Sequence, residues 1–361
     1  MLTQTRMEQE VRETPAVIEA QLSRNEEKWL KVIQRLQSQP VPFALTIARG
    51  SSDHAATFLK YLLEVKLGIP TVSAAPSVLT IYQRELNLKG GLVIGISQSG
   101  QSPDLLEMMQ SARRSGALTL AIVNQENSPL AELAEYVIPI HAGPETAVAA
   151  SKSYLGSLTA FLHFLAMYEK HSLKLSGPDR MSEALKDLPR LMEETFAADW
   201  TALAQSWFEI SRDHDQSGII LGRGFGYPIA QETALKLKET SALHAEAFSS
   251  AEFLHGPLGL IKAFFPVLLY LQSDQTLKGS LMTAKKIKEA GGSVFVISPK
   301  DLVQPEETCY TQMFCVPKTR HPLLDSLLGI AGFYPMAAKL AVLRGMNPDQ
   351  PKFLKKITET R

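Results

Sequence analysis

Short apolar runs alternate with helical patterns along most of the chain. Residues 44–50 read as a short buried strand that ends in a glycine turn, and helical spacing follows over residues 53–65. Residues 92–96 form another apolar run, and helical spacing follows over residues 105–114. Continuous apolar strands joined by helices are typical of a parallel sheet covered on both faces. The pattern therefore predicts an α/β fold built from βαβ units.

The same pattern occurs a second time. Residues 218–224 repeat the strand and the glycine turn, so that Arg49 and Arg223, each followed by glycine, lie 174 positions apart. Residues 267–271 repeat the apolar run at 92–96, and the glutamines that follow the two runs, Gln98 and Gln272, have the same offset. A further β-rich run follows in each half, at residues 118–123 and 293–297. A constant offset predicts a duplication.

The duplication predicts two tandem domains, each a parallel sheet flanked by helices in a flavodoxin-like αβα sandwich. A segment rich in Leu, Met and Glu between the halves predicts a helical linker. The expected organisation is an N-terminal helical segment (1–30), a first domain (31–175), a helical linker (176–198), a second domain (199–345) and a tail (346–361).

Composition narrows the class of protein. Lys and Arg together number 37, as do Asp and Glu, so no overall charge favours nucleic acid or a membrane surface as a partner. Residues 1–28 contain no apolar signal segment, and we expect no membrane span. Cys309 and Cys315 match neither a zinc motif nor a disulfide framework. These features predict a cytoplasmic protein with reduced cysteines and no metal.

The loop after the run at 92–96 reads Ser97-Gln-Ser-Gly-Gln-Ser-Pro103. Ser102 is a suitable N-cap and Pro103 fits the first helical position, and free N–H groups at a helix start bind anions. The loop is either a phosphate site or an ordinary capped turn. Ser52 at the end of the earlier strand either joins that site or only caps its own helix. The second half has Asp274 in the matching loop, so we expect a single phosphate site for the two halves.

Charged residues cluster after the second Arg-Gly turn. Glu232, Lys236 and Glu239 share one helical face, which is either a solvated salt-bridge stripe or part of a ligand site at the sheet edge. Two glutamates and two histidines follow within residues 244–255, without the spacing of a helical metal motif. His255 precedes Gly-Pro and should lie at the end of an element, presented by a turn.

At this point the chain resembles the sugar isomerase (SIS) domain family, and in particular the isomerase half of the glucosamine-6-phosphate synthases, over residues 25–361. Six motifs carry the resemblance in order: Ser97–Gly100, Leu221–Gly224, Ala234–Glu239, His244–Ala247, His255–Leu258 and Asp349–Pro351. The resemblance implies two tandem SIS domains, an aminosugar-phosphate substrate, no cofactor, and a homodimer with shared active sites.

The resemblance also implies roles for individual residues. The phosphate-binding set is implied to be Ser52, Ser97, Gln98, Ser99 and Ser102, the last in place of the family's threonine. Glu145 and Val148 fall on sugar-binding positions, and Ala150 replaces a family serine nearby. The implied catalytic residues are Glu239 for the C1–C2 proton shift, its partner Lys236, His255 for ring opening, and Lys356 as the Schiff-base lysine. Imidazole and carboxylate groups suit these proton transfers.

The synthases begin with a glutaminase domain whose nucleophile is an N-terminal cysteine, whereas this sequence begins Met1-Leu2-Thr3 and its first cysteine is Cys309. We therefore expect water to take the role of the attacking group, which ammonia has in the synthases. The expected reaction converts glucosamine 6-phosphate and water to fructose 6-phosphate and ammonia, through ring opening, a C1–C2 proton shift and imine hydrolysis. The alternatives are another SIS aldose–ketose isomerase or deaminase, such as one for galactosamine, and a fructosamine-6-phosphate deglycase. A further alternative is a non-catalytic phosphosugar-binding regulator. Such a regulator should carry a helix-turn-helix or other output domain, and the first 30 residues are too short for one.

Overall fold

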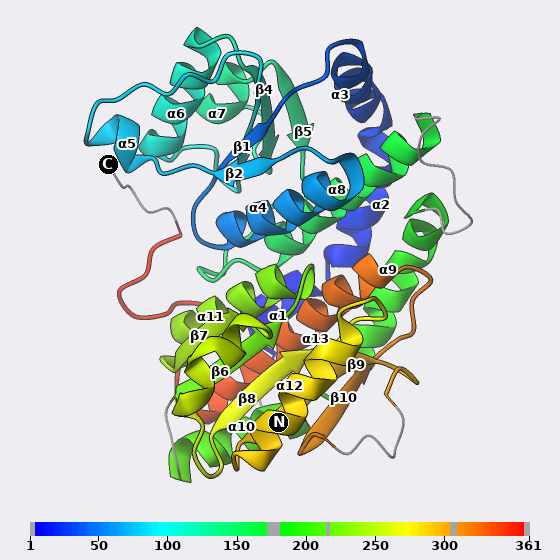
Figure 1. Ribbon diagram of the computed structural model, residues 1–361, viewed down its shortest axis with the longest axis vertical. Coiled ribbons are helices and arrows are strands. Elements are labelled where there is room, and N and C mark those ends of the chain that lie inside the picture. The colour runs from blue at the N-terminus through cyan, green and yellow to red at the C-terminus, as the bar shows by residue number, and fades with distance from the viewer. Residues whose placement is uncertain (1–3, 172–180, 214–216, 304–308, 357–361) are drawn as a thin grey trace. The chain divides into compact units, whose positions relative to one another are not determined.

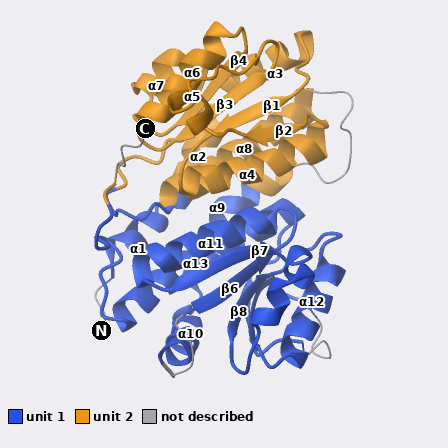
Figure 2. Cartoon of the chain, turned by 60° about the vertical axis from the view of Figure 1, so that its left-hand side comes forward, with its two compact units in different colours: residues 1–15, 146–151, 186–354 blue, residues 16–145, 152–185, 355–361 orange. Residues whose placement is uncertain are grey.

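The structure is a computed structural model that describes residues 4–171, 181–213, 217–303 and 309–356. The chain divides into two compact units (Figure 2). Unit 1 consists of residues 1–15, 146–151 and 186–354, and unit 2 of residues 16–145, 152–185 and 355–361. Parts of the predicted linker (176–180) and tail (357–361) lie outside the described residues, and the predicted domain boundaries stay predictions.

Unit 2 holds the first sheet and its helices (Figure 1). Its strands are β1 (Ala44–Ile47), β2 (Thr71–Ser73), β3 (Leu92–Ser97), β4 (Leu118–Val123) and β5 (Tyr136–Pro139). Its α-helices are α2 (Thr14–Arg24, which starts just inside unit 1), α3 (Glu26–Ser38), α4 (Ser51–Leu62), α5 (Ser77–Thr80), α6 (Pro103–Arg114), α7 (Pro129–Leu133) and α8 (Lys152–His171). A π-helical turn, η1 (Leu63–Leu67), extends α4.

Unit 1 holds the second sheet. Its strands are β6 (Ser217–Gly222), β7 (His244–Ser249), β8 (Pro266–Tyr270), β9 (Ser293–Pro299) and β10 (Gln312–Val316). Its α-helices are α1 (Arg6–Val11), α9 (Met181–Ala197, which begins in unit 2), α10 (Thr201–Asp213), α11 (Gly226–Ser241), α12 (Leu277–Glu289) and α13 (Pro322–Leu343). Two 3₁₀ turns, η2 (Glu252–His255) and η3 (Pro257–Leu260), follow β7.

The two sheets have the same topology. All strand pairings are parallel. The strand orders are β2-β1-β3-β4-β5 and β10-β9-β8-β6-β7. Adding five to each strand number of the first order and reading it from the other edge gives the second order. The register repeats as well, because Leu45 is paired with Val93 and Ile219 with Val267, each member displaced by 174 positions. The predicted α/β fold with two duplicated domains is confirmed.

Central strands supply the core of each unit. Every residue of β3, β4, β8 and β9 is buried, as expected for parallel strands with helices on both faces. Helix α3 illustrates the matching helical pattern, since its buried residues lie on one face: Trp29, Val32, Ile33 and Leu36.

Both first strands end in the same backbone turn. Gly50 and Gly224 have the same φ of 54°, in the left-handed region that favours glycine. In unit 1, a Cβ on Gly222 would lie 2.0 Å from the carbonyl oxygen of Gly226, so this glycine lets α11 begin directly against the end of β6. The turn places the first residues of α4 and α11 at the carboxyl edges of their sheets, where open α/β sheets bind ligands.

Helix α13 corrects one expectation. The sequence analysis expected no segment apolar enough to span a membrane, but α13 has 22 residues and a mean hydropathy of 1.5 over its best window. In the structure 83% of that window is buried inside the protein, as in a core helix. No other helix in the described ranges has this length and hydropathy.

Candidate functional site

The serine loop in unit 2 follows β3 and begins α6. Ser97 is buried, and its Oγ accepts a hydrogen bond of 2.9 Å from the N–H of Gly100. Gln98, Ser99 and Ser102 are half-buried, and Ser102 is the N-cap of α6, with Pro103 as the first helical residue. The Ser102 side chain makes no capping bond, so the loop presents hydroxyl donors at the positive end of the α6 dipole, as anion sites do.

Gly100 is required by close packing as well as by backbone conformation. Its φ is 64°, and a Cβ there would lie 2.2 Å from the Oγ of Ser128, the N-cap of α7. The Ser128 hydroxyl is buried without a hydrogen-bond partner. The loop therefore cannot accept a side chain at position 100 without moving α7.

A second loop reaches the same edge of this sheet, because β1 and β3 are parallel neighbours. Ser52 lies in the first turn of α4 and is half-buried. Arg49, just before the turn, places its Nε and Nη2 each 2.7 Å from Oδ2 of Asp104, a buried residue in the first turn of α6. The sequence analysis noted Arg49 only as part of the repeat. The guanidinium offsets a carboxylate that would otherwise oppose an anion at this helix start.

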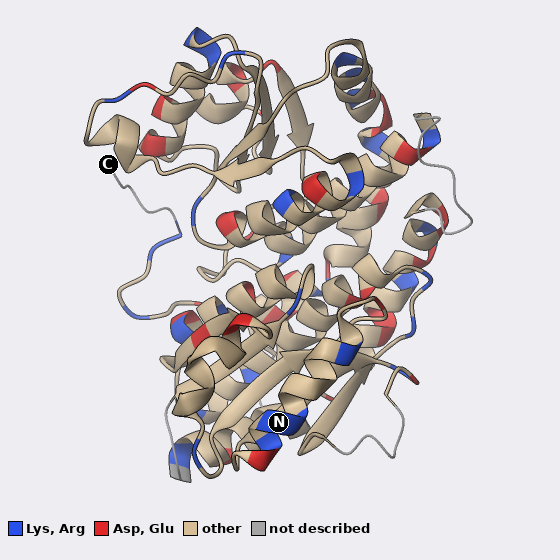
Figure 3. Cartoon of the chain, in the orientation of Figure 1, with Lys and Arg blue, Asp and Glu red and all other residues tan. Residues whose placement is uncertain are grey.

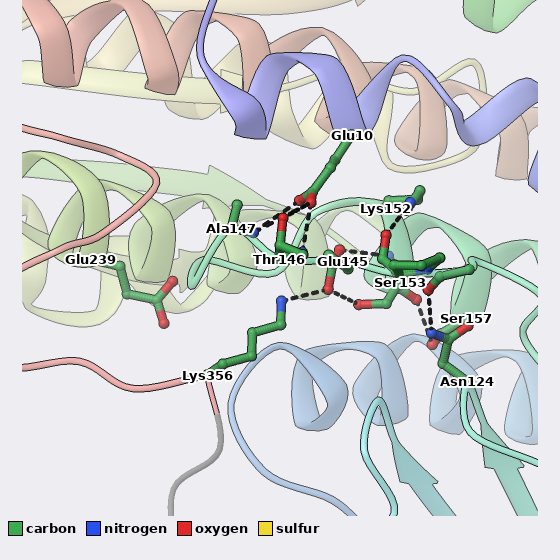
Figure 4. Close-up of polar contacts among 12 residues, drawn as sticks. Glu10, Asn124, Glu145, Thr146, Ala147, Lys152, Ser153, Ser157, Glu239 and Lys356 are labelled. Carbon is green, nitrogen blue, oxygen red and sulfur yellow. Dashed lines mark hydrogen bonds and ion pairs between the residues drawn. The ribbon is translucent and has the colours of Figure 1, made fainter.

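Glu145 and Lys356 meet in unit 2, although 211 positions separate them (Figure 4). The Nζ of Lys356 lies 2.8 Å from Oε2 of Glu145, whose side chain is fully buried. The same carboxylate accepts bonds from the N–H and the hydroxyl of Ser153, at 3.0 and 2.7 Å. Both predicted residues thus share one polar cluster at the start of α8.

Val148, the other predicted sugar-binding position, belongs to unit 1. Its N–H donates to the carbonyl of Asp349 at 3.0 Å, and its side chain is half-buried. The preceding backbone is held by Glu10 of α1, whose carboxylate accepts bonds from the N–H groups of Thr146 and Ala147 (Figure 4). The sequence analysis did not identify Glu10, and no local pattern distinguishes it from the other glutamates of this acidic segment.

The charged residues of α11 form a buried cluster in unit 1. Glu232 and Lys236 are fully buried, and the side chain of Glu239 is 22% exposed. Lys236 makes a short hydrogen bond to Oε2 of Glu239, and its Nζ lies 3.5 Å from Oε1 of Glu232. The solvated-stripe interpretation is therefore wrong for this face, because α11 packs it inside the unit. Glu232 was part of that stripe but was not among the predicted site residues.

His255 is the last residue of η2 in unit 1, and its side chain is exposed. Gly256 follows with a φ of 142°, which favours glycine, and Phe253 anchors the turn with a fully buried ring that packs against Phe248. The sequence expectation that a turn presents His255 at the end of an element is confirmed.

The predicted residues thus fall into two groups. Unit 2 contains the serine loop, Ser52, Glu145 and Lys356, and unit 1 contains Val148, Lys236, Glu239 and His255. Across the described ranges, no cluster of three His, Cys, Asp or Glu residues could hold a metal ion. Lys and Arg are interspersed with Asp and Glu over both units (Figure 3), in line with their equal numbers.

Comparison with known proteins identifies the family. The model of the SIS domain matches residues 44–167 and again residues 214–340. Glutamine–fructose-6-phosphate aminotransferase (isomerizing) of Thermus thermophilus is 32% identical over 357 residues, which are 97% of this chain and 58% of that enzyme. The chain thus spans little more than half the length of this curated relative.

Two solved structures extend the comparison. A protein of Silicibacter pomeroyi, provisionally named a phosphosugar isomerase, is 36% identical with a TM-score of 0.83, covering 96% of this chain and all of that one. The C-terminal domain of glucosamine-fructose-6-phosphate aminotransferase from Francisella tularensis has the same fold, with 24% identity and a TM-score of 0.82 over 97% of this chain and 99% of that one. With two matches to one domain model and a duplicated sheet, the chain belongs to the SIS domain family.

Proposed function

We propose that the chain is a phosphosugar isomerase that acts on a hexosamine 6-phosphate, most specifically glucosamine 6-phosphate, and releases ammonia. The observation that carries the proposal is the buried Glu232–Lys236–Glu239 cluster on α11. Burying three charged groups on one helix face does not favour folding over apolar residues of similar size, so the cluster requires a chemical reason. Similarity to the Silicibacter protein over its full length supports a phosphosugar as the substrate.

In this proposal the serine loop binds the phosphate. The hydroxyls of Ser52, Ser97, Ser99 and Ser102 and the Gln98 amide supply neutral donors to the phosphate oxygens, at the positive end of the α6 dipole. Binding the far end of the sugar fixes the reacting end, and this fixation lowers the entropy cost of each later step.

The proposed reaction has three steps. His255 moves the proton of the C1 hydroxyl to the ring oxygen and opens the hexosamine. Glu239 then takes the proton from C2 and returns it to C1, while O1 gains a proton and the amine loses one, which converts the C1 aldehyde and C2 amine into a C1 alcohol and a C2 imine. Water adds to C2, and the carbinolamine expels ammonia to leave the C2 ketone. Lys236 offsets the charge of Glu239.

Lys356 is proposed as an alternative amine nucleophile at C2. Its ammonium must lose a proton before it can attack a carbonyl, and Glu145 is the group in contact with it. Attack forms a Schiff base with loss of one water or, from the imine, with loss of ammonia. The homodimer, the shared use of His255 and the cytoplasmic location stay predictions from the sequence.

The test is release of ammonia from glucosamine, galactosamine and N-acetylglucosamine 6-phosphates, with ketose 6-phosphate measured in parallel. Glu239→Gln should lower turnover by about 10² to 10⁴, the usual range for a general base, while leaving binding intact. Glu289→Gln, an exposed glutamate of α12, is the control and should leave turnover unchanged.

Other outcomes separate the alternatives. Interconversion of phosphosugars without ammonia would leave an isomerase, and release of an amino acid from a fructosamine 6-phosphate would indicate a deglycase. Tight binding with no turnover of any of these compounds would overturn the enzymatic proposal in favour of a phosphosugar-binding regulator.

A further inference from the structure

A tyrosine from another helix completes the charged cluster of α11. Tyr334 of α13 is fully buried, and its hydroxyl donates a hydrogen bond of 3.1 Å to Oε1 of Glu232. Helices α11 and α13 pack against each other within unit 1. The cluster therefore extends from Tyr334 through Glu232 and Lys236 to Glu239.

The distances show why the hydroxyl matters. Lys236 bonds closely to Glu239, but its Nζ lies 3.5 Å from Oε1 of Glu232, beyond the usual range for a good hydrogen bond. Glu232 is fully buried, and a buried carboxylate needs hydrogen-bond donors to remain charged. The Tyr334 hydroxyl supplies such a donor to the same oxygen that faces Lys236.

We propose that Tyr334 is a positioning residue for proton transfer. Its hydroxyl fixes the Glu232 carboxylate, which in turn lies beside Lys236 while Lys236 bonds to Glu239. This inference rests on the proposed role of Glu239. The titratable groups around Glu232 include Lys236 from α11, Tyr334 from α13 and Tyr270 from β8.

The chain offers a matched control in Tyr270. This tyrosine is also buried in unit 1, and its hydroxyl is 2.7 Å from Oγ1 of Thr233, the residue next to Glu232 on α11. Burial raises the pKa of Tyr270 far above its usual value, so it stays neutral. Tyr334→Phe and Tyr270→Phe therefore each remove one buried hydroxyl from neighbouring contacts, but only the first removes a donor to a carboxylate.

The experiment measures kcat and KM for the full chain and both variants. Tyr334→Phe should lower kcat about tenfold or more, the effect of losing a hydrogen bond to a charged group, with little change in KM. Tyr270→Phe, which removes no donor to a carboxylate, should leave kcat unchanged.

A second measurement does not depend on turnover. Tyr334→Phe removes a donor to a buried carboxylate, so it should lower the melting temperature more than Tyr270→Phe does. In a Glu232→Gln background the extra effect of Tyr334→Phe on kcat should disappear. Equal effects of the two tyrosine variants on kcat and on the melting temperature would overturn the inference. Absence of turnover in the unchanged chain would remove the proposed function, while the melting data would still test the contact.

Discussion

The helix that follows the first strand occurs in both units, as α4 in unit 2 and α11 in unit 1. The matching positions of the two helices are apolar in α4 and charged in α11. At an offset of 174 positions, Glu232, Lys236 and Glu239 of unit 1 correspond to Phe58, Leu62 and Val65 of unit 2. Phe58 and Leu62 are fully buried, as are Glu232 and Lys236. The same backbone position therefore accepts either an apolar core or a charged cluster. The fold requires only burial there, so the charges in unit 1 point to function.

The loops after β3 and β8 differ in the opposite sense. In unit 2 the hydroxyl oxygens of Ser97 and Ser99 accept bonds from backbone N–H groups, whereas in unit 1 the hydroxyls of Ser273 and Thr276 donate to the chain's own carboxylates. Asp325 of α13 accepts bonds from the N–H and hydroxyl of Ser273, and Asp274 accepts bonds from Thr276. Asp274 was expected to make this loop unsuitable for an anion. Asp325 adds a second carboxylate to the same loop. Duplication thus preserved the backbone of the two units, while a few side chains at matching positions differ in charge.

The largest expected effect comes from removing the central charge of the α11 cluster. Lys236→Met should lower the free energy of unfolding by about 3–5 kcal/mol, because it leaves buried carboxylates without their cation, and should reduce turnover at least a hundredfold. Urea unfolding and initial rates measure the two effects.

The double variant Glu232→Leu/Lys236→Met brings this helix closer to its counterpart in unit 2. It should regain most of the lost stability and none of the activity. If Lys236→Met alone were as stable as the unchanged chain, that result would contradict the view that these charges are buried together.

A smaller effect is expected in the serine loop. Ser99→Ala should raise KM for the hexosamine 6-phosphate about tenfold without a comparable change in kcat, because it removes one donor to a charged ligand. Ser273→Ala is the corresponding change in unit 1, and it should leave KM unaltered while lowering the free energy of unfolding by about 1–3 kcal/mol. Similar KM values for Ser99→Ala and the unchanged chain would exclude Ser99 from phosphate binding.

The smallest effect concerns the carboxylate in the second loop. Burial raises the pKa of Asp325, although hydrogen bonds from Ser273 and Thr319 act against the shift. The folded chain therefore holds this proton to a higher pH than the unfolded chain, and the stabilisation is complete below the ordinary value of 3.8 and lost as the pH rises through the raised pKa.

Relative to Asp325→Asn, the unchanged chain should lose unfolding free energy as the pH rises from ~4 to neutrality. Urea unfolding of both proteins across this range tests the sign. A difference that increased with pH would mean that the hydrogen bonds outweigh burial.

The strands that sequence predicts and those that it misses differ in one physical respect. The six predicted strands, β1, β3, β4, β6, β8 and β9, are the central strands of the two sheets, and the four missed strands, β2, β5, β7 and β10, are the edges. Central strands are buried on both faces and read as apolar runs. Edge strands are partly exposed, as in β7, where His244 and Glu246 face outward, so their composition does not distinguish them from loops.

The site shows a similar division between local and distant information. The shared face of Glu232, Lys236 and Glu239 follows from helical spacing alone. Its burial depends on α13, about a hundred positions away, and no periodicity indicates Tyr334. The contact between Glu145 and Lys356 likewise joins distant segments, so only the resemblance to a family singled out both residues.

The carboxylate of Asp349 accepts hydrogen bonds from the N–H groups of Arg6 and Met7, the first residues of α1. During synthesis, the five strands of unit 2 are complete once residue 139 has been made. Helix α1, in contrast, must wait for a partner 342 residues further along the chain. Unit 2 should therefore assemble on the ribosome ahead of unit 1, whose helix α1 acquires these contacts only after residue 349 has emerged.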